Sequence, residues 1–195
     1  YNNFDFAAAG IFVPTDPNTN QPFLNGEYQT ARNNTDGGYI RGVELGFTQT
    51  LEFLPGAFSG LGFTTSYSYT ESSISKTNTN AGFARDVGFP GLSKSVFNGT
   101  LFYDYKAFST RVSVRYKEAF VGEEMMAENP MDVYYGDETV VDYQASYNFD
   151  NGINLVFQIN NVTDEPTTTY FGSEAQTGTI QYYGRQMFLG VNYSF

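Results

Sequence analysis

The side chains that could do chemistry in this sequence are carboxylates, arginines and aromatic rings, because its 195 residues include no Cys and no His. That absence removes disulfides, thiolate metal sites and the commonest catalytic base. No nucleophile, base and orienting group assemble into a hydrolytic site, so we expect no enzyme and no cofactor. The simplest chemistry available to the charged residues is ion pairing. The charged candidates are Glu44, Asp104, Asp142, Arg111 and Arg115.

A second set of candidates combines acidic and aromatic side chains. The segment 117–138 holds seven carboxylates, which would attract a cation or a cationic ligand. Aromatic rings in this segment and in the next could stack on a sugar ring or on an aromatic ligand. The candidates for ligand contact are Asp132, Tyr134, Tyr135, Tyr170 and Phe171. The alternative is a solvated loop whose rings pack against neighbouring loops.

A weak calcium-binding pattern lies near the start of the sequence. Asp16, Asn18, Asn20 and Glu27 follow the spacing of ligands 1, 3, 5 and 12 in a calcium loop. The sixth position is Gln21, where the sharp turn requires Gly, and no flanking helices are expected. A turn rich in Asn and Asp explains the same spacing without a metal.

These candidates need elements to position them, and the pattern of apolar and polar side chains predicts strands. Alternation with a period of two recurs in seven segments of about eight to fifteen residues. The expected strands span residues 39–53, 60–72, 95–105, 109–116, 139–149, 153–160 and 185–195. Strands of a soluble β-sandwich are usually about 5–6 residues long, so the pattern favours a membrane barrel.

The strand at 109–116 gives the clearest signal of orientation. Arg111 and Arg115 fall on one face, and Val112 and Val114 fall on the other. An arginine at the middle of a lipid-facing surface costs about 2–4 kcal/mol, so we expect the arginine face to point into the barrel lumen. Alternation places Glu44, Asp104 and Asp142 on the lumen faces of their own strands.

The composition is compatible with a barrel in a membrane. No apolar run approaches the roughly 18–20 residues of a membrane helix. The mean hydropathy is polar, at −0.36, as expected when only alternate residues face lipid. The net charge of −11 argues against a nucleic-acid partner, whose phosphates require a basic surface.

The expected connections alternate between short and long. Short turns are expected at 54–58, 106–108 and 150–152, and long loops at 74–94, 117–138 and 161–181. Outer-membrane barrels combine short periplasmic turns with long extracellular loops, so the long loops are expected to be extracellular. Residues 1–37 read as part of another extracellular loop, and residues 38–195 as a barrel segment.

Four strings in this order resemble the C-terminal part of TonB-dependent outer-membrane receptors. They are GGYIRGVELGF at 37–47, GLSKSVFNGTLFYDY at 91–105, QINNVTDEP at 158–166 and YYGRQMFLGVNYSF at 182–195. The resemblance implies an all-β, antiparallel transmembrane barrel of 22 strands with an N-terminal plug. This chain would supply about the last seven strands, and no part of it resembles the plug.

The resemblance also implies a function and a set of partners. The function is active uptake of a small nutrient across the bacterial outer membrane, with an oligosaccharide favoured over a ferric siderophore. The partners are lipid and lipopolysaccharide, the protein's own plug and remaining strands, and the TonB energy-coupling complex. The barrel-insertion machinery would read Tyr193 and Phe195 as an assembly signal.

Two other classes of protein remain open at this point. The first is a small outer-membrane barrel of eight strands with a structural or adhesive role. Its eighth strand would come from residues 4–13. The second is a soluble sandwich that binds a carbohydrate.

Overall fold

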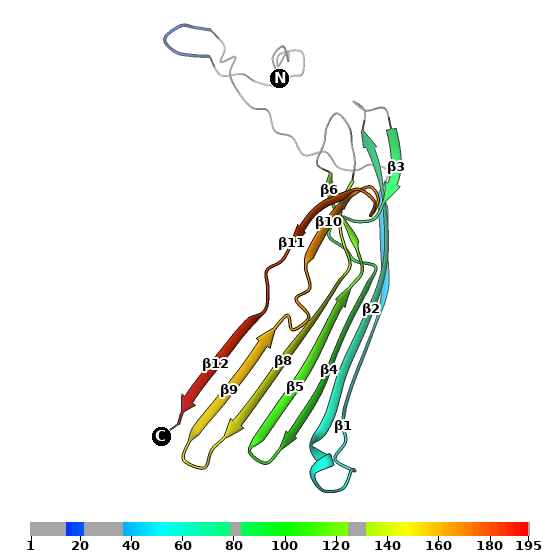
Figure 1. Cartoon of the computed structure of the whole chain (residues 1–195). Helices are drawn as coiled ribbons and strands as arrows, with labels where there is room; N and C mark the ends of the chain where they lie inside the picture. Colours follow the sequence, from blue (N-terminus) through cyan, green and yellow to red (C-terminus); the bar gives the residue numbers. More distant parts are fainter. Residues whose placement is uncertain (1–14, 22–36, 79–82, 125–131, 195) are drawn as a thin grey trace. The chain divides into compact units, whose positions relative to one another are not determined.

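The computed structural model describes residues 15–21, 37–78, 83–124 and 132–194 (Figure 1). The chain divides into two compact units, Tyr1–Thr35 and Asp36–Phe195. In the first unit the described residues form a turn, in which the backbone N–H of Asn20 donates to the carbonyl oxygen of Asp16. The strand expected from residues 4–13 lies outside the described residues.

The second unit is built on one antiparallel sheet, in which each strand of the main path pairs with the next (Figure 1). The main path is β1 (Gly38–Thr50), β2 (Leu61–Asn78), β4 (Ser95–Tyr105), β5 (Phe108–Lys117), β8 (Glu138–Asn148), β9 (Ile153–Asn160) and β12 (Gln186–Tyr193). A short strand, β3 (Phe83–Val87), pairs with β2. The prediction of an all-β antiparallel fold is confirmed, and these seven strands correspond to the seven expected from alternation. Within the described residues β1 and β12 do not pair, so the sheet is not closed.

The pairing register makes the sheet two-faced, because residues directly opposite each other on paired strands share a face. Val112 lies between Leu101 of β4 and Tyr143 of β8. Arg111, one position earlier, lies between Phe102 and Gln144 on the opposite face. The apolar face of the sheet therefore continues from strand to strand without interruption at this level.

The apolar face is open to the surroundings rather than covered by a second layer. Leu45 is 66% exposed, Leu101 57% and Leu189 78%. Of the apolar side chains whose burial the structure describes, only Val121 is buried. A soluble sandwich would bury such a face against another sheet, and exposed apolar patches of this extent mark contact with a membrane or a partner.

The connections at the two ends of the sheet differ (Figure 1). At one end are the η1 3-10 helix (Gly56–Gly60), a turn at Lys106 and Ala107, and a turn at 150–152. At the other end a second sheet has the order β11-β10-β7-β6. Its strands are β6 (Phe120–Glu124), β7 (Asp132–Tyr135), β10 (Thr167–Phe171) and β11 (Thr177–Gln181). No helix in the described ranges is both long and apolar enough to cross a membrane.

The long connections were expected to be loops, and parts of them instead form strands. Strand β2 continues to Asn78 instead of ending near residue 72, and the second sheet occupies parts of the other two connections. Thr, Val and Tyr in Asp132–Tyr135 and Thr167–Phe171 favour strands. These segments are too short and too polar for alternation to reveal them. The expected first strand also ends earlier, at Thr50 instead of residue 53.

Gly152 holds the end of the C-terminal strand in place. It has a φ of +83°, and a Cβ there would meet the carbonyl oxygen of Ser194. The backbone N–H of Ser194 in turn donates to the carbonyl oxygen of Gly152, at 3.0 Å. The β8–β9 turn therefore requires glycine for its conformation and for this close approach.

We expect Gly152→Ala to destabilise the sheet by about 2 kcal/mol, because it combines backbone strain with displacement of Ser194. The matched control is Gly56→Ala, since Gly56 has a similar φ of +62° with nothing within 4 Å of its Cβ position. Gly56→Ala should incur only the cost of backbone strain, without the displacement of a neighbour. The folded fraction is measured as the fast-migrating band in semi-native electrophoresis. Equal losses for both variants would mean that the contact with Ser194 is unimportant.

Candidate functional site

The five charged candidates lie on one face of the main sheet. Glu44 is opposite Ser68 across β1 and β2, and Asp104 is opposite Ser109 across β4 and β5. The pairings continue through β5 and β8 to place Arg111, Arg115 and Asp142 on this same face. We call this surface the polar face of the sheet.

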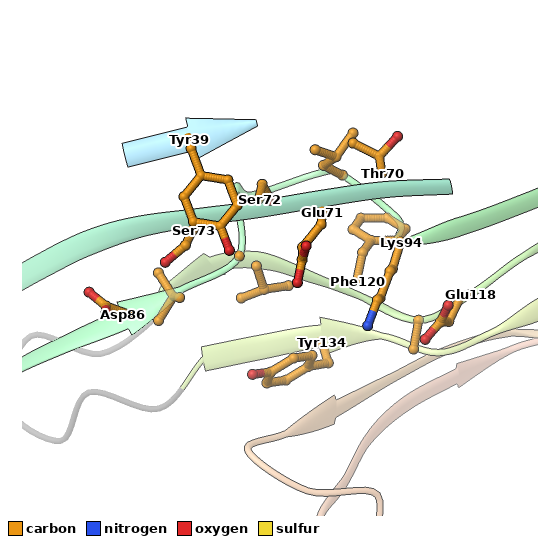
Figure 2. Close-up of a pocket in the computed structure, with 15 residues that line it drawn as sticks. Tyr39, Thr70, Glu71, Ser72, Ser73, Asp86, Lys94, Glu118, Phe120 and Tyr134 are labelled. Atoms are coloured by element: carbon orange, nitrogen blue, oxygen red, sulfur yellow. The ribbon is translucent and has the colours of Figure 1, made fainter. Parts of the chain in front are cut away.

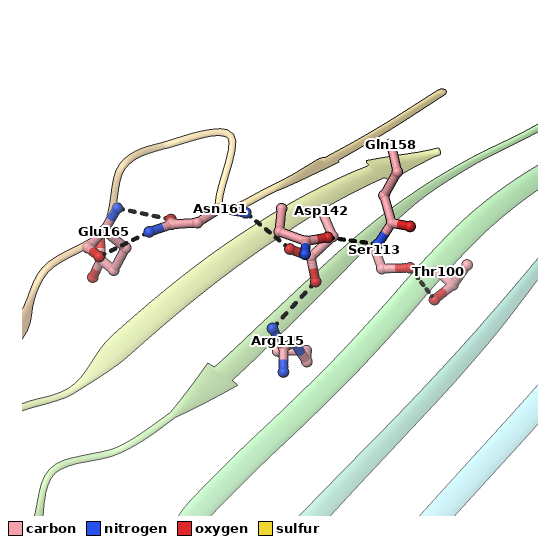
Figure 3. Close-up of polar contacts among 8 residues, drawn as sticks. Thr100, Ser113, Arg115, Asp142, Gln158, Asn161 and Glu165 are labelled. Carbon is pink, nitrogen blue, oxygen red and sulfur yellow. Dashed lines mark hydrogen bonds and ion pairs between the residues drawn. The ribbon is translucent and has the colours of Figure 1, made fainter. Parts of the chain in front are cut away.

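Hydrogen bonds and ion pairs cross the polar face between strands, some of them drawn in Figure 3. The guanidinium of Arg115 lies 3.2 Å from a carboxylate oxygen of Asp142. The hydroxyls of Thr100 and Ser113 lie 2.8 Å apart. Such cross-strand pairs each contribute about 0.2–1 kcal/mol, so the face is held together without an apolar core.

A turn that follows β9 is joined to this face through Asn161 (Figure 3). The Asn161 backbone N–H donates to Asp142 Oδ1 at 3.0 Å, and its side-chain amide donates to the carbonyl oxygen of Glu165 at 3.0 Å. The Glu165 backbone N–H donates back to Asn161 Oδ1 at 2.8 Å. The Glu165 carboxylate then accepts from the Thr139 backbone N–H at 3.2 Å. The sequence string NNVTDEP does not reveal this network, because two of its bonds join residues 19 and 26 positions apart in the chain.

The aromatic candidates for ligand contact pack in pairs on the second sheet. The rings of Tyr134 and Tyr170 are stacked, with centroids 5.1 Å apart and an interplanar angle of 2°. Tyr135 stacks on Phe120, also at 5.1 Å. Burial raises the pKa of the Tyr170 hydroxyl. Tyr134 and Tyr170 are thus brought together from two predicted loops, as neighbours on β7 and β10.

The other two ligand candidates are placed differently. Asp132, at the start of β7, is only 4% exposed. Phe171 lies opposite Val133 where β10 pairs with β7. Of the five ligand candidates, Tyr134 is the one that lines the pocket described next.

A pocket of about 460 Å³ lies where β2 meets β6 and β7 (Figure 2). Its charged lining residues are Glu71, Asp86, Lys94 and Glu118, and its aromatic ones are Tyr39, Phe120 and Tyr134. Residues 88–94 form part of the wall. This wall is held to β2 by the Phe89 N–H, which donates to Ser72 Oγ at 2.9 Å, and to β6 by the Gly91 N–H, which donates to the carbonyl oxygen of Val121 at 2.8 Å.

Arg41 orients two side chains of the pocket. Its guanidinium lies 2.7 Å from a carboxylate oxygen of Glu71 and 5.2 Å from the centre of the Tyr39 ring. Hydrogen bonding to Arg41 and its charge lower the pKa of the Glu71 carboxyl, with Lys94 adding a smaller effect in the same direction. The Arg41–Glu71 pair therefore persists below the pH at which a glutamate normally becomes protonated.

We expect the β1–β2 end near Arg41 to lose amide-exchange protection only as pH falls below the ordinary glutamate value of 4.5. A lowered pKa gives stability that is complete above the ordinary value and is lost as pH falls through the native value. In Arg41→Met only the smaller effect of Lys94 on the Glu71 pKa remains, so protection should be weaker and should depend less on pH, whereas Arg41→Lys should keep part of the Arg41 effect. The measurement is hydrogen exchange from pH 3 to 7, corrected for intrinsic rates. A wild-type loss that begins well above 4.5 would contradict this expectation.

The calcium candidate forms a local turn. Asp16 Oδ1 accepts from the Asn18 backbone N–H at 2.8 Å, which lowers the pKa of this carboxyl. Asn20 has a φ of +52°, which suits a turn rich in Asn. Glu27, the fourth proposed ligand, lies outside the described residues. Across the described ranges, no three acidic side chains gather into a metal-binding group.

Comparison with known proteins bears on the whole arrangement. A search of curated proteins and a search of solved structures found no match. A family model described as TonB dependent receptor-like, beta-barrel, matches residues 10–162, which is more than half of the chain. The match is consistent with the two-faced antiparallel sheet and with its unequal ends. The chain therefore belongs to the TonB-dependent receptor family and carries sequence of that family's β-barrel.

Proposed function

We propose that this chain is part of an outer-membrane receptor that imports a nutrient with energy supplied through the TonB complex. The observation that carries the proposal is the two-faced sheet of long strands. Its apolar side chains are exposed on one face, and Arg111, Arg115 and Asp142 lie on the other. In lipid, such a sheet must close into a barrel so that every backbone group is paired.

The sheet supplies seven strands of a 22-stranded plugged barrel in this proposal. Its two edges, β1 and β12, would pair with other strands of the same protein, because an open edge in lipid leaves backbone groups without partners. The polar face would line the lumen and contact the plug. Glu44, Asp104 and Asp142 would be its acidic contacts, and Tyr193 and Phe195 would be read during barrel insertion.

The unequal ends of the sheet support one direction in the membrane. The short turns, including that at 150–152, would face the periplasm, and the second sheet would lie outside the cell. Residues 1–37 would form an extracellular loop region, and residues 38–195 the barrel segment. Lipopolysaccharide would surround the outer end.

The proposed nutrient is an oligosaccharide rather than a ferric siderophore. Seven carboxylates in 117–138 and a net charge of −11 repel an anionic ferric chelate. Stacked tyrosines in the second sheet supply the aromatic surfaces on which sugar rings pack. The proposal therefore assigns substrate recognition to the extracellular end.

Uptake by intact cells tests this function. Cells that carry the full-length receptor, and matched cells from which its gene is deleted, receive labelled neutral oligosaccharides or a labelled ferric siderophore, with and without a protonophore. We expect one neutral oligosaccharide to accumulate only in energised cells with the receptor. Uptake that is equal in the deleted strain, or that is insensitive to the protonophore, would contradict TonB-dependent import.

The denatured mass of the polypeptide tests the barrel assignment separately. A mass several-fold above that of these 195 residues is expected for a plugged receptor. A mass near that of the 195 residues would support the eight-stranded barrel instead.

A further inference from the structure

We propose that the pocket between β2, β6 and β7 binds one uncharged sugar ring. This inference rests on the proposed receptor function and adds to it a specific site and ligand class. The side chains that would recognise the ring are Tyr39, Glu71, Asp86, Lys94, Glu118 and Tyr134 (Figure 2).

The pocket has a suitable size and a preformed wall. Its volume of about 460 Å³ falls within the roughly 300–1,000 Å³ that is usual for small-molecule sites. Besides the two bonds that hold residues 88–94, the Thr70 N–H donates to the carbonyl oxygen of Lys94 at 2.8 Å, and the Glu118 N–H donates to that of Ser95 at 2.8 Å. Four backbone donors thus fix the segments that carry Lys94 and Glu118. Little ordering entropy would remain to be lost on binding.

The charges in the pocket favour an uncharged ligand. Of the three lining carboxylates, Glu71 is neutralised by Arg41 and one more is balanced by Lys94. The residual charge is therefore small and negative, which disfavours a ferric chelate or phosphate with net negative charge. A cation would meet the ammonium of Lys94, whose pKa is raised by its hydrogen bond to Tyr69 and by nearby acids. Lys94 therefore stays protonated and disfavours a second positive charge.

The remaining hydrogen-bonding capacity suits a polyol. Glu71 is already paired with Arg41, and Asp86 accepts from Ser75 Oγ at 2.7 Å. Each carboxylate keeps further lone pairs, and Lys94 offers N–H donors. A sugar hydroxyl both donates and accepts, so one ring can use the acids and the lysine together.

Aromatic rings supply flat surfaces for the C–H faces of the sugar. Tyr134 is stacked on Tyr170, which fixes the plane of its ring, and it contributes to the pocket lining. Tyr39 is oriented by the Arg41 guanidinium 5.2 Å from its ring centre. Figure 2 shows Tyr39 and Tyr134 approaching the pocket from β1 and β7. Rings held in this way give stacking surfaces without losing side-chain freedom on binding.

The pocket lies beyond the apolar band of the sheet. Alternation along β1 puts Tyr39 and Arg41 on the same face as Val43 and Leu45, but the Arg41–Glu71 pair marks the point where charge replaces apolar side chains. Charged residues on that face are tolerated near the membrane interface and not at its centre. Two sources of sugar are available to a pocket near the outer membrane interface: a free oligosaccharide and the glycan of lipopolysaccharide.

Calorimetric titration of the full-length receptor, purified in detergent free of lipopolysaccharide, tests the inference. The probes are neutral hexasaccharides of glucose, mannose, galactose and xylose, and a ferric catecholate. We expect one hexasaccharide to bind, and Lys94→Gln or Glu118→Gln to weaken its binding about ten- to hundred-fold, as usual for losing a hydrogen bond to a charged group. Glu174→Gln is the matched control, because Glu174 is an exposed acid of the β10–β11 hairpin outside the pocket lining. It should bind normally.

The outcomes separate this inference from the receptor function. Hexasaccharide binding that is unchanged in Lys94→Gln and Glu118→Gln, or binding of the ferric catecholate alone, overturns the pocket assignment while energised uptake still supports a receptor. No binding of any probe overturns the sugar assignment, and loss of energised uptake overturns the receptor function itself. Competition by added lipopolysaccharide identifies the membrane glycan as the source of the sugar. Lack of competition identifies the free oligosaccharide, and either result supports a sugar site.

Discussion

Val112→Arg is expected to remove most of the assembled receptor from the outer membrane, whereas Arg111→Leu should leave assembly close to normal. Val112 is 40% exposed on the apolar face, between Leu101 and Tyr143 on the neighbouring strands. If this face meets lipid, an arginine there costs about 2–4 kcal/mol. Leucine at 111 would stand beside Phe102 on the polar face and would desolvate no charge.

The two substitutions are a matched pair, because they change adjacent residues of one strand and exchange the same two kinds of side chain. Assembly is measured as the amount of heat-modifiable receptor in isolated outer membranes, relative to total synthesis. A cost of about 2–4 kcal/mol corresponds to a thirty- to thousand-fold shift in a folding equilibrium. Equal tolerance of both variants, or greater damage from Arg111→Leu, would reverse the assignment of the faces.

The faces of the main sheet could be predicted from sequence, because the side-chain period of a strand is two and a shift by one residue moves every side chain to the other face. Leu155 and Phe157 of β9 illustrate this alternation, because both are exposed on the same face as the apolar residues of β12 that pair with them. The bounds of β4 and β9 were predicted to the residue for the same reason.

The second sheet and the pocket could not be predicted in this way. Strands of four or five residues, such as Asp132–Tyr135 and Thr167–Phe171, are too short to show a period. Tyr134 and Tyr170 were each recognised as candidates, but their stacking depends on the pairing of β7 with β10 across 36 positions of sequence. The pocket depends on Lys94 and Glu118, which no motif distinguishes from other surface charges.

The Asn161 network gives the second large effect. Asn161→Ala should destabilise the turn after β9 by about 3 kcal/mol. The φ of +54° at Asn161 would cost an alanine about 1–2 kcal/mol, and the two hydrogen bonds between Asn161 and Glu165 contribute about 1 kcal/mol each. Asn161→Gly keeps the backbone conformation and loses only the side-chain bonds, so its cost should be nearer 2 kcal/mol.

Hydrogen exchange of the peptide spanning 161–167 measures this directly, with the Phe108 end of β5 as an internal reference. We expect exchange about a hundred-fold faster in Asn161→Ala and about thirty-fold faster in Asn161→Gly, since 1.4 kcal/mol is a factor of ten. Identical rates in the two variants would show that backbone strain at residue 161 does not contribute to the effect. Wild-type rates in both variants would show that the hydrogen-bond network does not stabilise the turn.

Because Asp142 accepts from Asn161 and also pairs with Arg115, opening of the turn should weaken the polar face beside it. Faster exchange at the Arg115 end of β5 in Asn161→Ala, with none at the Phe108 end, would show that the turn and the polar face of the sheet are energetically coupled.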